Sequence, residues 1–296
     1  MNYFRLFYLF TVNTGINLFH SVYNLIKITR PLNGLITFVS ICVAVFISSN
    51  SGTTISIYIL AALSGMLTGA SGNVINDYLD IEIDKINRPD RVLPSGKINP
   101  ILALSFYALL TIVSLILSYL ISISNLLIVM AASLLLFLYS KYFKRITLAG
   151  NLIVAFVTGF AFIYGGVAAG NYSENIFPAL FASLTTLIRE IVKDIEDIKG
   201  DSNFKVDSLP IVFGLRNTNK LILGLTILLI ILTTLPFFLV KYKIEFIVIA
   251  MLIINPLLVY SMKILFSSNS KVEMSKVSSL IKVVMVIGLI AIVLGQ

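Results

Sequence analysis

The sequence predicts an all-α polytopic membrane protein in which nine transmembrane helices surround a central cavity open to the cytoplasmic side. The 296 residues are 58% hydrophobic, with a mean hydropathy of +0.98. Only 12% of them are charged, whereas a soluble domain carries about 25%. Several apolar runs also reach the roughly 20 residues that a spanning helix needs. These observations exclude a soluble globular core, and we expect residues 1–296 to form a single integral-membrane domain.

The first element precedes the spans. Residues 1–24 are apolar and aromatic, with Arg5, Asn13 and Asn17 interrupting the run. No small-residue cleavage site leads from it into a soluble domain, which argues against a removed signal peptide. We therefore expect residues 1–26 to form an interfacial amphipathic segment that leads into the first span.

The nine spans follow in order from length and hydropathy. Pro31 suits the first turn of the first span, where its missing N–H costs nothing. Some connections are very short, such as Ser122 to Ser124, so consecutive helices are expected to be antiparallel neighbours. The predicted spans are residues 31–49, 54–79, 100–120, 123–141, 147–169, 175–198, 217–239, 244–265 and 277–295.

Loop charges predict the orientation of these spans. Basic residues follow the second, fourth, sixth and eighth spans, whereas the loops after the first and third carry no charge. The loop after the fifth span carries only Glu174, and Lys241 and Lys243 after the seventh are the exception. By the positive-inside rule the amino terminus and the even-numbered loops are cytoplasmic and Gln296 lies outside.

Acidic residues are concentrated in two windows. Eleven of the 14 lie in residues 77–90 and 190–207, each at the end of an apolar run. A carboxylate near a bilayer costs roughly 2.5–3.5 kcal/mol on insertion scales, so such residues are functional candidates. Either window alone could be a solvated helix end neutralised by neighbouring lysines. Two windows on the predicted cytoplasmic side favour a shared site.

Helical spacing places the acids of each window on one face. In the first window the arc is about 100° and in the second about 60°. The first face holds Asn73, Asn76, Asp77, Asp80 and Asp84; the second holds Glu190, Asp194, Asp197 and Asp201, with Lys193 at its edge. Like charges at these spacings repel, and oxygen ligands favour Mg²⁺, with Mn²⁺ as a substitute. The single cysteine, Cys42, and single histidine, His20, exclude disulfides, thiolate metal sites and multi-histidine sites.

This pattern indicates loss of diphosphate from an allylic carbon. Metal ions and basic groups would stabilise the charge that develops on the leaving group. An aromatic-rich helical cavity would shield the resulting carbocation from water. The basic residues that could hold phosphate oxygens are Arg88, Arg91, Lys97, Lys144, Arg145 and Lys205, although positive-inside topology is the commoner explanation for any single one of them.

Three motifs resemble those of the UbiA superfamily of intramembrane prenyltransferases. The first, NDxxDxxxD, begins at Asn76 and continues into residues 87–96; the second, KDxxDxxGD, begins at Lys193 and leads to Ser208-Leu209-Pro210. The third runs from Tyr139 through Lys144 and Arg145 to Gly150 and Asn151. The first helix also opens with a typical Arg-Pro-Leu-Asn, residues 30–33. The resemblance covers the chain from about Asn24 to its end.

The resemblance implies a cytoplasm-facing nine-helix fold and Mg²⁺-dependent prenyl transfer from a diphosphate to a lipophilic acceptor. It implies that the two acidic faces hold the metal–diphosphate and that Tyr139 lies beside the prenyl C1. Metal ligands are expected at Asn76, Asp77, Asp80, Asp84, Glu190, Asp194, Asp197 and Asp201. Catalysis is expected to depend on Asp77, Asp80, Asp194, Asp197 and Tyr139. Substrate contacts are expected from Arg30, Asn33, Asn73, Asn76, Arg88, Arg91, Lys144, Arg145, Lys193 and Lys205.

Within the superfamily the acidic windows are most similar to the archaeal digeranylgeranylglyceryl phosphate synthase branch. That similarity implies geranylgeranyl diphosphate as donor, geranylgeranylglyceryl phosphate as acceptor, membrane lipids as surroundings and no nucleic-acid partner. The FKVD stretch before Ser208 replaces a glycine common in relatives and puts that loop's geometry in question. An aromatic or quinone-precursor acceptor is the nearest alternative. A transporter is a weaker one, because both windows lie at helix ends on one side. The sequence predicts no oligomeric state.

Overall fold

The structure is a computed structural model that describes residues 20–203, 207–239 and 242–296. Helices are the only regular elements in these ranges, which confirms the predicted all-α class. Eight of the described helices are long and apolar enough to span a membrane, and one bent pair brings the number to nine. The chain is therefore a multi-pass membrane protein.

The spans agree with the predicted ones to within a few residues, except at the last helix. α14 begins at Lys271 rather than at residue 277, because the Ser270 side chain accepts a hydrogen bond from the Glu273 N–H and caps the helix. The spans between the first and the last are formed by α3 (Ile55–Leu79), α5 (Pro100–Tyr119), α6 (Ile123–Lys141), α7 (Ala149–Ala169), α8 (Ile176–Asn203), α10 (Gly214–Leu232) with α11 (Leu235–Leu239), and α12 (Ile244–Ile249) with a π-helical turn (Ala250–Ile254) and α13 (Asn255–Ser267).

The first predicted span is shorter than expected. α2 (Pro31–Ile47) has 17 residues and forms, with the preceding helix His20–Ile28, a pair bent by 53°. Pro31 occupies the first turn, as predicted, and Arg30 before it has a left-handed backbone with φ of 57°. A non-glycine residue held in this conformation costs roughly 1–2 kcal/mol. Most of the predicted interfacial segment, residues 1–19, lies outside the described residues.

The helix that carries the first acidic window is interrupted within it. α3 ends at Leu79 and the short α4 (Ile81–Asn87) begins at Ile81, with Asp80 joining them at φ −97° and ψ 8°. The expected single face from residue 73 to residue 84 is therefore divided between two helices. In contrast, the second window lies on one continuous helix, α8.

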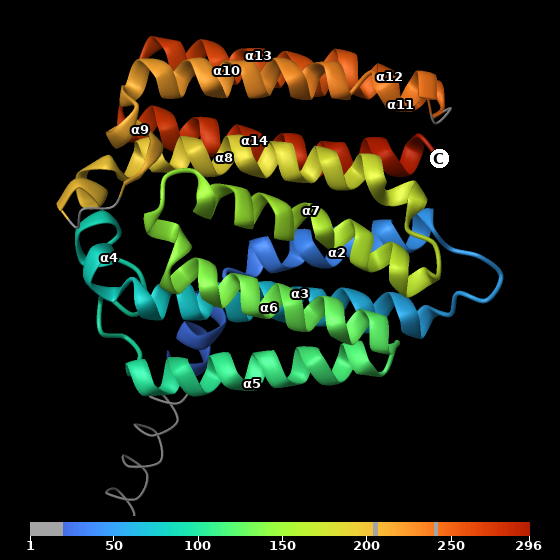
Figure 1. Ribbon diagram of the computed structural model, residues 1–296, viewed down its shortest axis with the longest axis horizontal. Helices are drawn as coiled ribbons and strands as arrows, with labels where there is room; N and C mark the ends of the chain where they lie inside the picture. Colours follow the sequence, from blue (N-terminus) through green and yellow to red (C-terminus); the bar gives the residue numbers. More distant parts are fainter. Residues whose placement is uncertain (1–19, 204–206, 240–241) are drawn as a thin grey trace, which may run out of the picture.

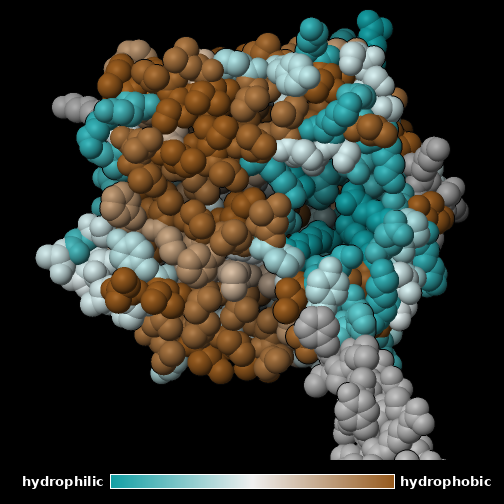
Figure 2. Space-filling view, turned by 180° about the vertical axis from the view of Figure 1, so that it is seen from behind, coloured by the Kyte–Doolittle hydropathy of each residue, from teal (hydrophilic) through white to brown (hydrophobic). Residues whose placement is uncertain are grey.

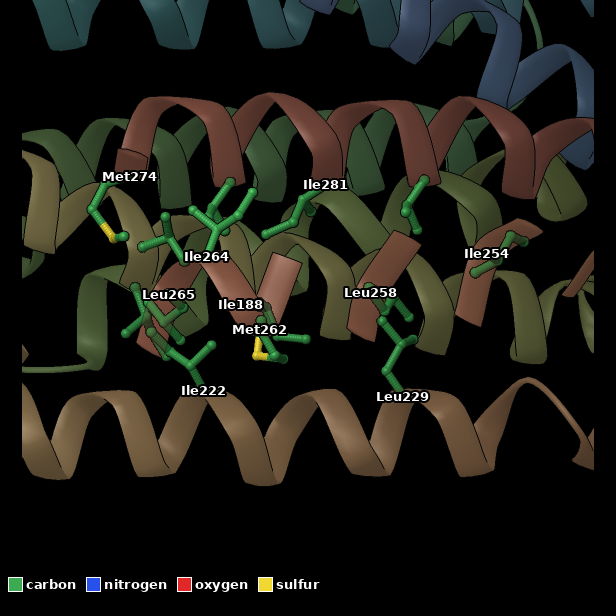
Figure 3. Close-up of a cluster of buried hydrophobic side chains, with 14 of the residues drawn as sticks. Ile188, Ile222, Leu229, Ile254, Leu258, Met262, Ile264, Leu265, Met274 and Ile281 are labelled. Carbon is green, nitrogen blue, oxygen red and sulfur yellow. The ribbon is translucent and has the colours of Figure 1, made fainter. Parts of the chain in front are cut away.

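The helices form two groups that meet along α7 and α8. α2, α3, α5, α6 and α7 pack on one side, and α8, α10, α13 and α14 on the other (Figure 1). In the second group, side chains of α8, α10, α13 and α14 interdigitate, and Ile188, Ile222, Leu258, Leu265 and Ile281 among them are almost fully buried (Figure 3). This apolar packing holds α8 and α14 side by side, and α8 carries the second acidic window.

The outer surface fits a lipid environment. Large apolar side chains such as Ile55, Ile101 and Leu252 are more than 70% exposed, which is unfavourable in water and ordinary against acyl chains. Figure 2 shows this apolar surface over the spans, and hydrophilic side chains around a hollow at one end. That end is the one where α4 lies in Figure 1.

Candidate active site

The hollow opens into a cavity of about 990 Å³ between the two helix groups. Both acidic windows line its polar end, and its far end is lined by aromatic and aliphatic side chains, including the stacked Phe156 and Phe160. The predicted site residues that line it are Arg30, Asn33, Asn73, Asn76, Asp80, Asp84, Arg88, Arg91, Tyr139, Lys144, Arg145, Glu190, Lys193, Asp194, Asp197 and Asp201. One cavity thus collects nearly all of the residues predicted from the motifs.

Cations hold the three aspartates of the first acidic face, Asp77, Asp80 and Asp84. Asp77 accepts from Arg30 at 2.5 Å and from Arg91 at 3.2 Å. Arg91 also reaches Asp84 at 2.5 Å, and Lys144 forms an ion pair with Asp80. The side chain of Asp77 is 5% exposed and does not line the cavity. The structure therefore places Asp77 behind the wall, where it orients two arginines.

The second window has a different set of partners. Glu190 accepts from Lys193 through both oxygens, at 2.8 and 2.6 Å. Asp194 accepts from the neutral Asn151 amide at 2.8 Å. Asp197 accepts from Arg88 at 2.9 Å. The partners of Asp194 and Asp197 thus come from other parts of the chain, namely α7 and the residue that follows α4.

The Arg88–Asp197 bond joins the two windows directly. Arg88 follows α4 immediately, and its guanidinium also lies 3.9 Å from Glu196. Lys144 pairs with Asp80 and is close enough to influence the charge of Asp201. The two acidic surfaces consequently face one another across one opening, close enough for single side chains to bridge them.

Burial disfavours the charged form of the carboxylates just beyond the spans. Burial raises the pKa of Asp84, and the nearby Arg91 opposes that rise. Burial together with the neighbouring Asp197 raises the pKa of Asp201 to about 6. Asp201 makes no ion pair with any residue that the structure describes. The opening therefore holds negative charge that a cation would stabilise.

The donor atoms suit a hard divalent cation. Carboxylate and amide oxygens are the ligands that Mg²⁺ prefers, and two buried ones, Asn76 Oδ1 and Asp197 Oδ1, have no hydrogen-bond partner among the described residues. Within the described ranges no three acidic, histidine or cysteine side chains converge on one point. Several of the acidic side chains are paired with lysine and arginine side chains instead. An ion shared with a bound diphosphate fits this arrangement better than one held by the protein alone.

Tyr139 is positioned by a close approach of the backbone. A Cβ added to Gly150 would lie 3.1 Å from the Tyr139 ring and 3.0 Å from Lys144 Cα. The glycine lets the first turn of α7 pack against the 3₁₀ turn Phe143–Arg145, which carries Lys144 and Arg145. Asn151, the next residue, then reaches Asp194. The spacing of the third motif thus reflects packing as well as ligand contact.

Three residues that line the cavity were not predicted from the sequence, and one predicted substrate contact lies outside the described residues. Asn151, Arg189 and Lys282 line the cavity but were not among the expected contacts. Lys282 lies within the last apolar run, and such an isolated intramembrane charge is the signal that identifies it. Lys205 lies outside the described residues.

Comparisons with known proteins agree with these motifs. The sequence pattern of the UbiA prenyltransferase family matches residues 37–285. The digeranylgeranylglyceryl phosphate synthase of Methanosphaera stadtmanae is 36% identical over 270 residues, covering 91% of this chain and 98% of that protein. The enzyme of the same name from Methanocaldococcus jannaschii is 38% identical over 272 residues, covering 90% and 92%.

Solved structures show the same fold. A digeranylgeranylglyceryl phosphate synthase structure is 37% identical with a TM-score of 0.74, covering 93% of this chain and 98% of that one. A UbiA homologue from Archaeoglobus fulgidus bound to GPP and Mg²⁺ is 19% identical with a TM-score of 0.70, covering 91% and 99%. At this low identity, the similarity to the Archaeoglobus fulgidus protein shows a shared fold.

Proposed function

The chain belongs to the UbiA prenyltransferase family, and on this premise we propose that it transfers a geranylgeranyl group from geranylgeranyl diphosphate to geranylgeranylglyceryl phosphate. Diphosphate is the second product. The observation that carries the proposal is one cavity with two acidic surfaces at its mouth and an apolar interior. Relatives named for this activity, with identities of 36–38% over most of the chain, support the choice of substrates.

The reaction needs both ends of the cavity. The bond between C1 of the prenyl chain and the diphosphate oxygen breaks, and its electron pair leaves with diphosphate. The hydroxyl oxygen of the acceptor forms a bond to C1, and its proton passes to a diphosphate oxygen. Arg88 and Lys144 lie where they can stabilise charge on the leaving group. The aromatic walls, with Tyr139 nearest the polar end, exclude water from the cation.

Mg²⁺ would be held by the carboxylates that line the cavity. The residues that would contact it are Asn76, Asp80, Asp84, Glu190, Asp194, Asp197 and Asp201, together with diphosphate oxygens. When bound, it neutralises charge on the leaving group. The two unpartnered oxygens of Asn76 and Asp197 support this assignment. We propose that Mn²⁺ can replace it and that Asp77 acts through Arg30 and Arg91.

We propose that the mouth of the cavity lies on the cytoplasmic side, and the distribution of loop charges supports this orientation. The water-soluble diphosphate would then leave into the cytoplasm. Both lipid chains would remain among the helices or in the bilayer. Gln296 would lie on the outer side.

The test is a transfer assay with purified protein and labelled geranylgeranyl diphosphate. The acceptor panel holds geranylgeranylglyceryl phosphate, other glycerophosphates, and aromatic acids and quinone precursors. We expect transfer to geranylgeranylglyceryl phosphate, loss of activity in EDTA, and recovery with excess Mg²⁺. Transfer to an aromatic acceptor in preference would overturn the acceptor assignment. Activity that persists in EDTA would overturn the metal assignment.

A further inference from the structure

Two cations line the cavity without a carboxylate that pairs with them alone in the described part of the chain. Arg189 on α8 and Lys282 on α14 both face the cavity, and the two helices pack side by side (Figure 1). Both residues lie well inside their spans, residues 173–198 and 271–294. A charge at that depth is expensive, so it marks a functional contact by default.

Arg189 has hydrogen-bonding capacity to spare. Its side chain is 17% exposed, and its Nε is buried with no hydrogen-bond partner among the described residues. Its one ion pair in that part of the chain, to Glu190 Oε1 at 3.2 Å, is shared with Lys193, which holds the same carboxylate through both oxygens. A buried guanidinium presents five donors in a fork that matches phosphate oxygens. Most of these donors are free to bind a ligand.

Lys282 is the second half of this surface. Its side chain is half-buried, and it makes no ion pair or hydrogen bond with any residue that the structure describes. The charged groups near enough to influence it are Arg189, Arg30 and Glu190. Two of these three are cations. The lysine is therefore held beside two like charges and one carboxylate, and a bound anion would stabilise it further.

The charges on this side of the cavity do not balance. The cations are Arg30, Arg189, Lys193 and Lys282, and the carboxylates in contact with them are Glu190 and Asp77. Asp77 also neutralises Arg91. Among these groups the cations outnumber the carboxylates by two, and counting Glu196, which is near enough to influence Arg189, leaves an excess of about one to two positive charges. A phosphate monoester carries close to that charge at neutral pH.

This surface lies deeper than most of the acidic mouth, and Glu190, which pairs with Arg189, is the carboxylate at their boundary. Arg189 precedes Asp194 by five residues and Asp197 by eight, or roughly 8 and 12 Å along the helix axis. A diphosphate held at the mouth would leave this surface free. The proposed acceptor carries its phosphate on the carbon next to the one that bears the reacting hydroxyl. Anchoring that phosphate would fix the hydroxyl beside C1 of the donor.

We propose that Arg189 and Lys282 bind the phosphate monoester of the acceptor lipid, distinct from the site of the donor diphosphate. The inference rests on the proposed function, because it assigns the acceptor end of the same cavity. It also explains how one cavity distinguishes two phosphorylated lipids. Carboxylates and metal select the diphosphate, and the arginine and lysine on the inner side of Glu190 select the monoester.

The test compares Arg189→Gln and Lys282→Met with wild type in two assays. The first measures binding of labelled geranylgeranylglyceryl phosphate to the full-length protein in EDTA without donor, with phosphate-free geranylgeranylglycerol as the second ligand. We expect each variant to bind the phosphate-bearing lipid about tenfold more weakly and the phosphate-free lipid equally well. The second assay measures KM for each substrate, and we expect only the acceptor KM to rise.

Matched variants separate the loss of a phosphate contact from a general loss of packing. Lys276→Met changes an exposed lysine of the same helix that pairs with Glu273, and it should alter neither assay. Arg189→Lys and Lys282→Arg should restore much of the binding. A parallel rise in donor KM would overturn the inference by assigning these cations to diphosphate. Equal loss for both lipids would overturn it as a structural effect. Wild-type transfer to another acceptor would refute the proposed function, while the EDTA binding assay would still decide the phosphate site.

Discussion

The two acidic windows differ in how the protein neutralises them. In the first window Arg30, Arg91 and Lys144 hold the carboxylates, and the helix bends at Asp80. In the second the helix is continuous, and Asp194 has a neutral amide as its partner. The first window is therefore nearly balanced within the protein, and the second is not. The demand for an added cation arises mainly from α8.

The carboxylates beyond each span show the same contrast. Burial raises the pKa of both Asp84 and Asp201, but at Asp84 the opposing influence of Arg91 exceeds the repulsion from Asp80, whereas at Asp201 the opposing influence of Lys144 is smaller than the repulsion from Asp197. Asp197 adds to the effect at Asp201, whose pKa rises to about 6. The two acidic windows therefore have different roles although their motifs are similar. The first window positions arginine and lysine side chains, whereas the second needs an added cation to neutralise its carboxylates.

The largest expected effect comes from removing one charge in each window. Asp80→Asn and Asp194→Asn should each lower transfer by at least about a hundredfold, because each removes a group that holds the metal–diphosphate. Their effects on stability should diverge. Asp80→Asn leaves Lys144 without its partner and should lower Tm by about 3 °C, a modest value because 31% of the Lys144 side chain is exposed. Asp194→Asn keeps an acceptor for Asn151 and relieves repulsion from Glu190, so Tm should hold or rise.

Thermal unfolding in detergent and steady-state rates measure these two outcomes. Glu245→Gln, an exposed site in the first turn of α12, is the control and should change neither quantity. If Asp194→Asn destabilised the protein as much as Asp80→Asn, the proposed difference in neutralisation would be wrong.

Much of the fold and the windows could be predicted from sequence because charges are rare in this chain. Against long apolar runs, eleven clustered acids stand out, and hydropathy alone locates the spans. Ideal helical geometry, however, assigns Asp77 and Asp80 to one face. The bend at Asp80 divides that face, and Asp77 lies behind the cavity wall. Local periodicity cannot show a bend that tertiary ion pairs hold in place.

The contacts across the cavity could not be predicted for a related reason. Arg88–Asp197 joins residues 109 positions apart, and Lys144–Asp80 joins residues 64 apart. No spacing rule reaches such distances. Arg189 and Lys282 belong to helices that pack together only in the folded protein. Sequence identifies the charged residues, whereas packing determines which of them meet.

The next effect concerns competition between a lysine and the metal. Lys144→Met should increase the affinity for Mg²⁺ without substrate by about tenfold, because it frees Asp80 from its ion pair. The rate of transfer should nevertheless fall, since the leaving diphosphate loses a cation. Calorimetric titration with Mg²⁺ and the transfer assay measure these opposite changes.

Lys141→Met is the matched control for this experiment. Lys141 lies on the exposed surface three residues earlier, against the rings of Phe137 and Tyr142. Its removal should leave Mg²⁺ affinity unchanged. Weaker Mg²⁺ binding by Lys144→Met would show that the lysine supports the metal site instead of competing for it.

The smallest effect tests the bridge between the windows. Arg88→Gln removes the bond to Asp197 and should lower transfer by about threefold to tenfold at limiting Mg²⁺. Raising Mg²⁺ should restore most of the rate, because a second cation can take the place of the guanidinium beside Asp197. Lys85→Gln, on the exposed side of α4 in a pair with Glu82, is the control and should show no Mg²⁺-dependent defect. A loss that Mg²⁺ cannot restore would mean that Arg88 acts mainly on the leaving diphosphate and not by neutralising Asp197. The second window would then be neutralised by the donor complex alone, and the contrast between the two windows would be greater than the ion pairs indicate.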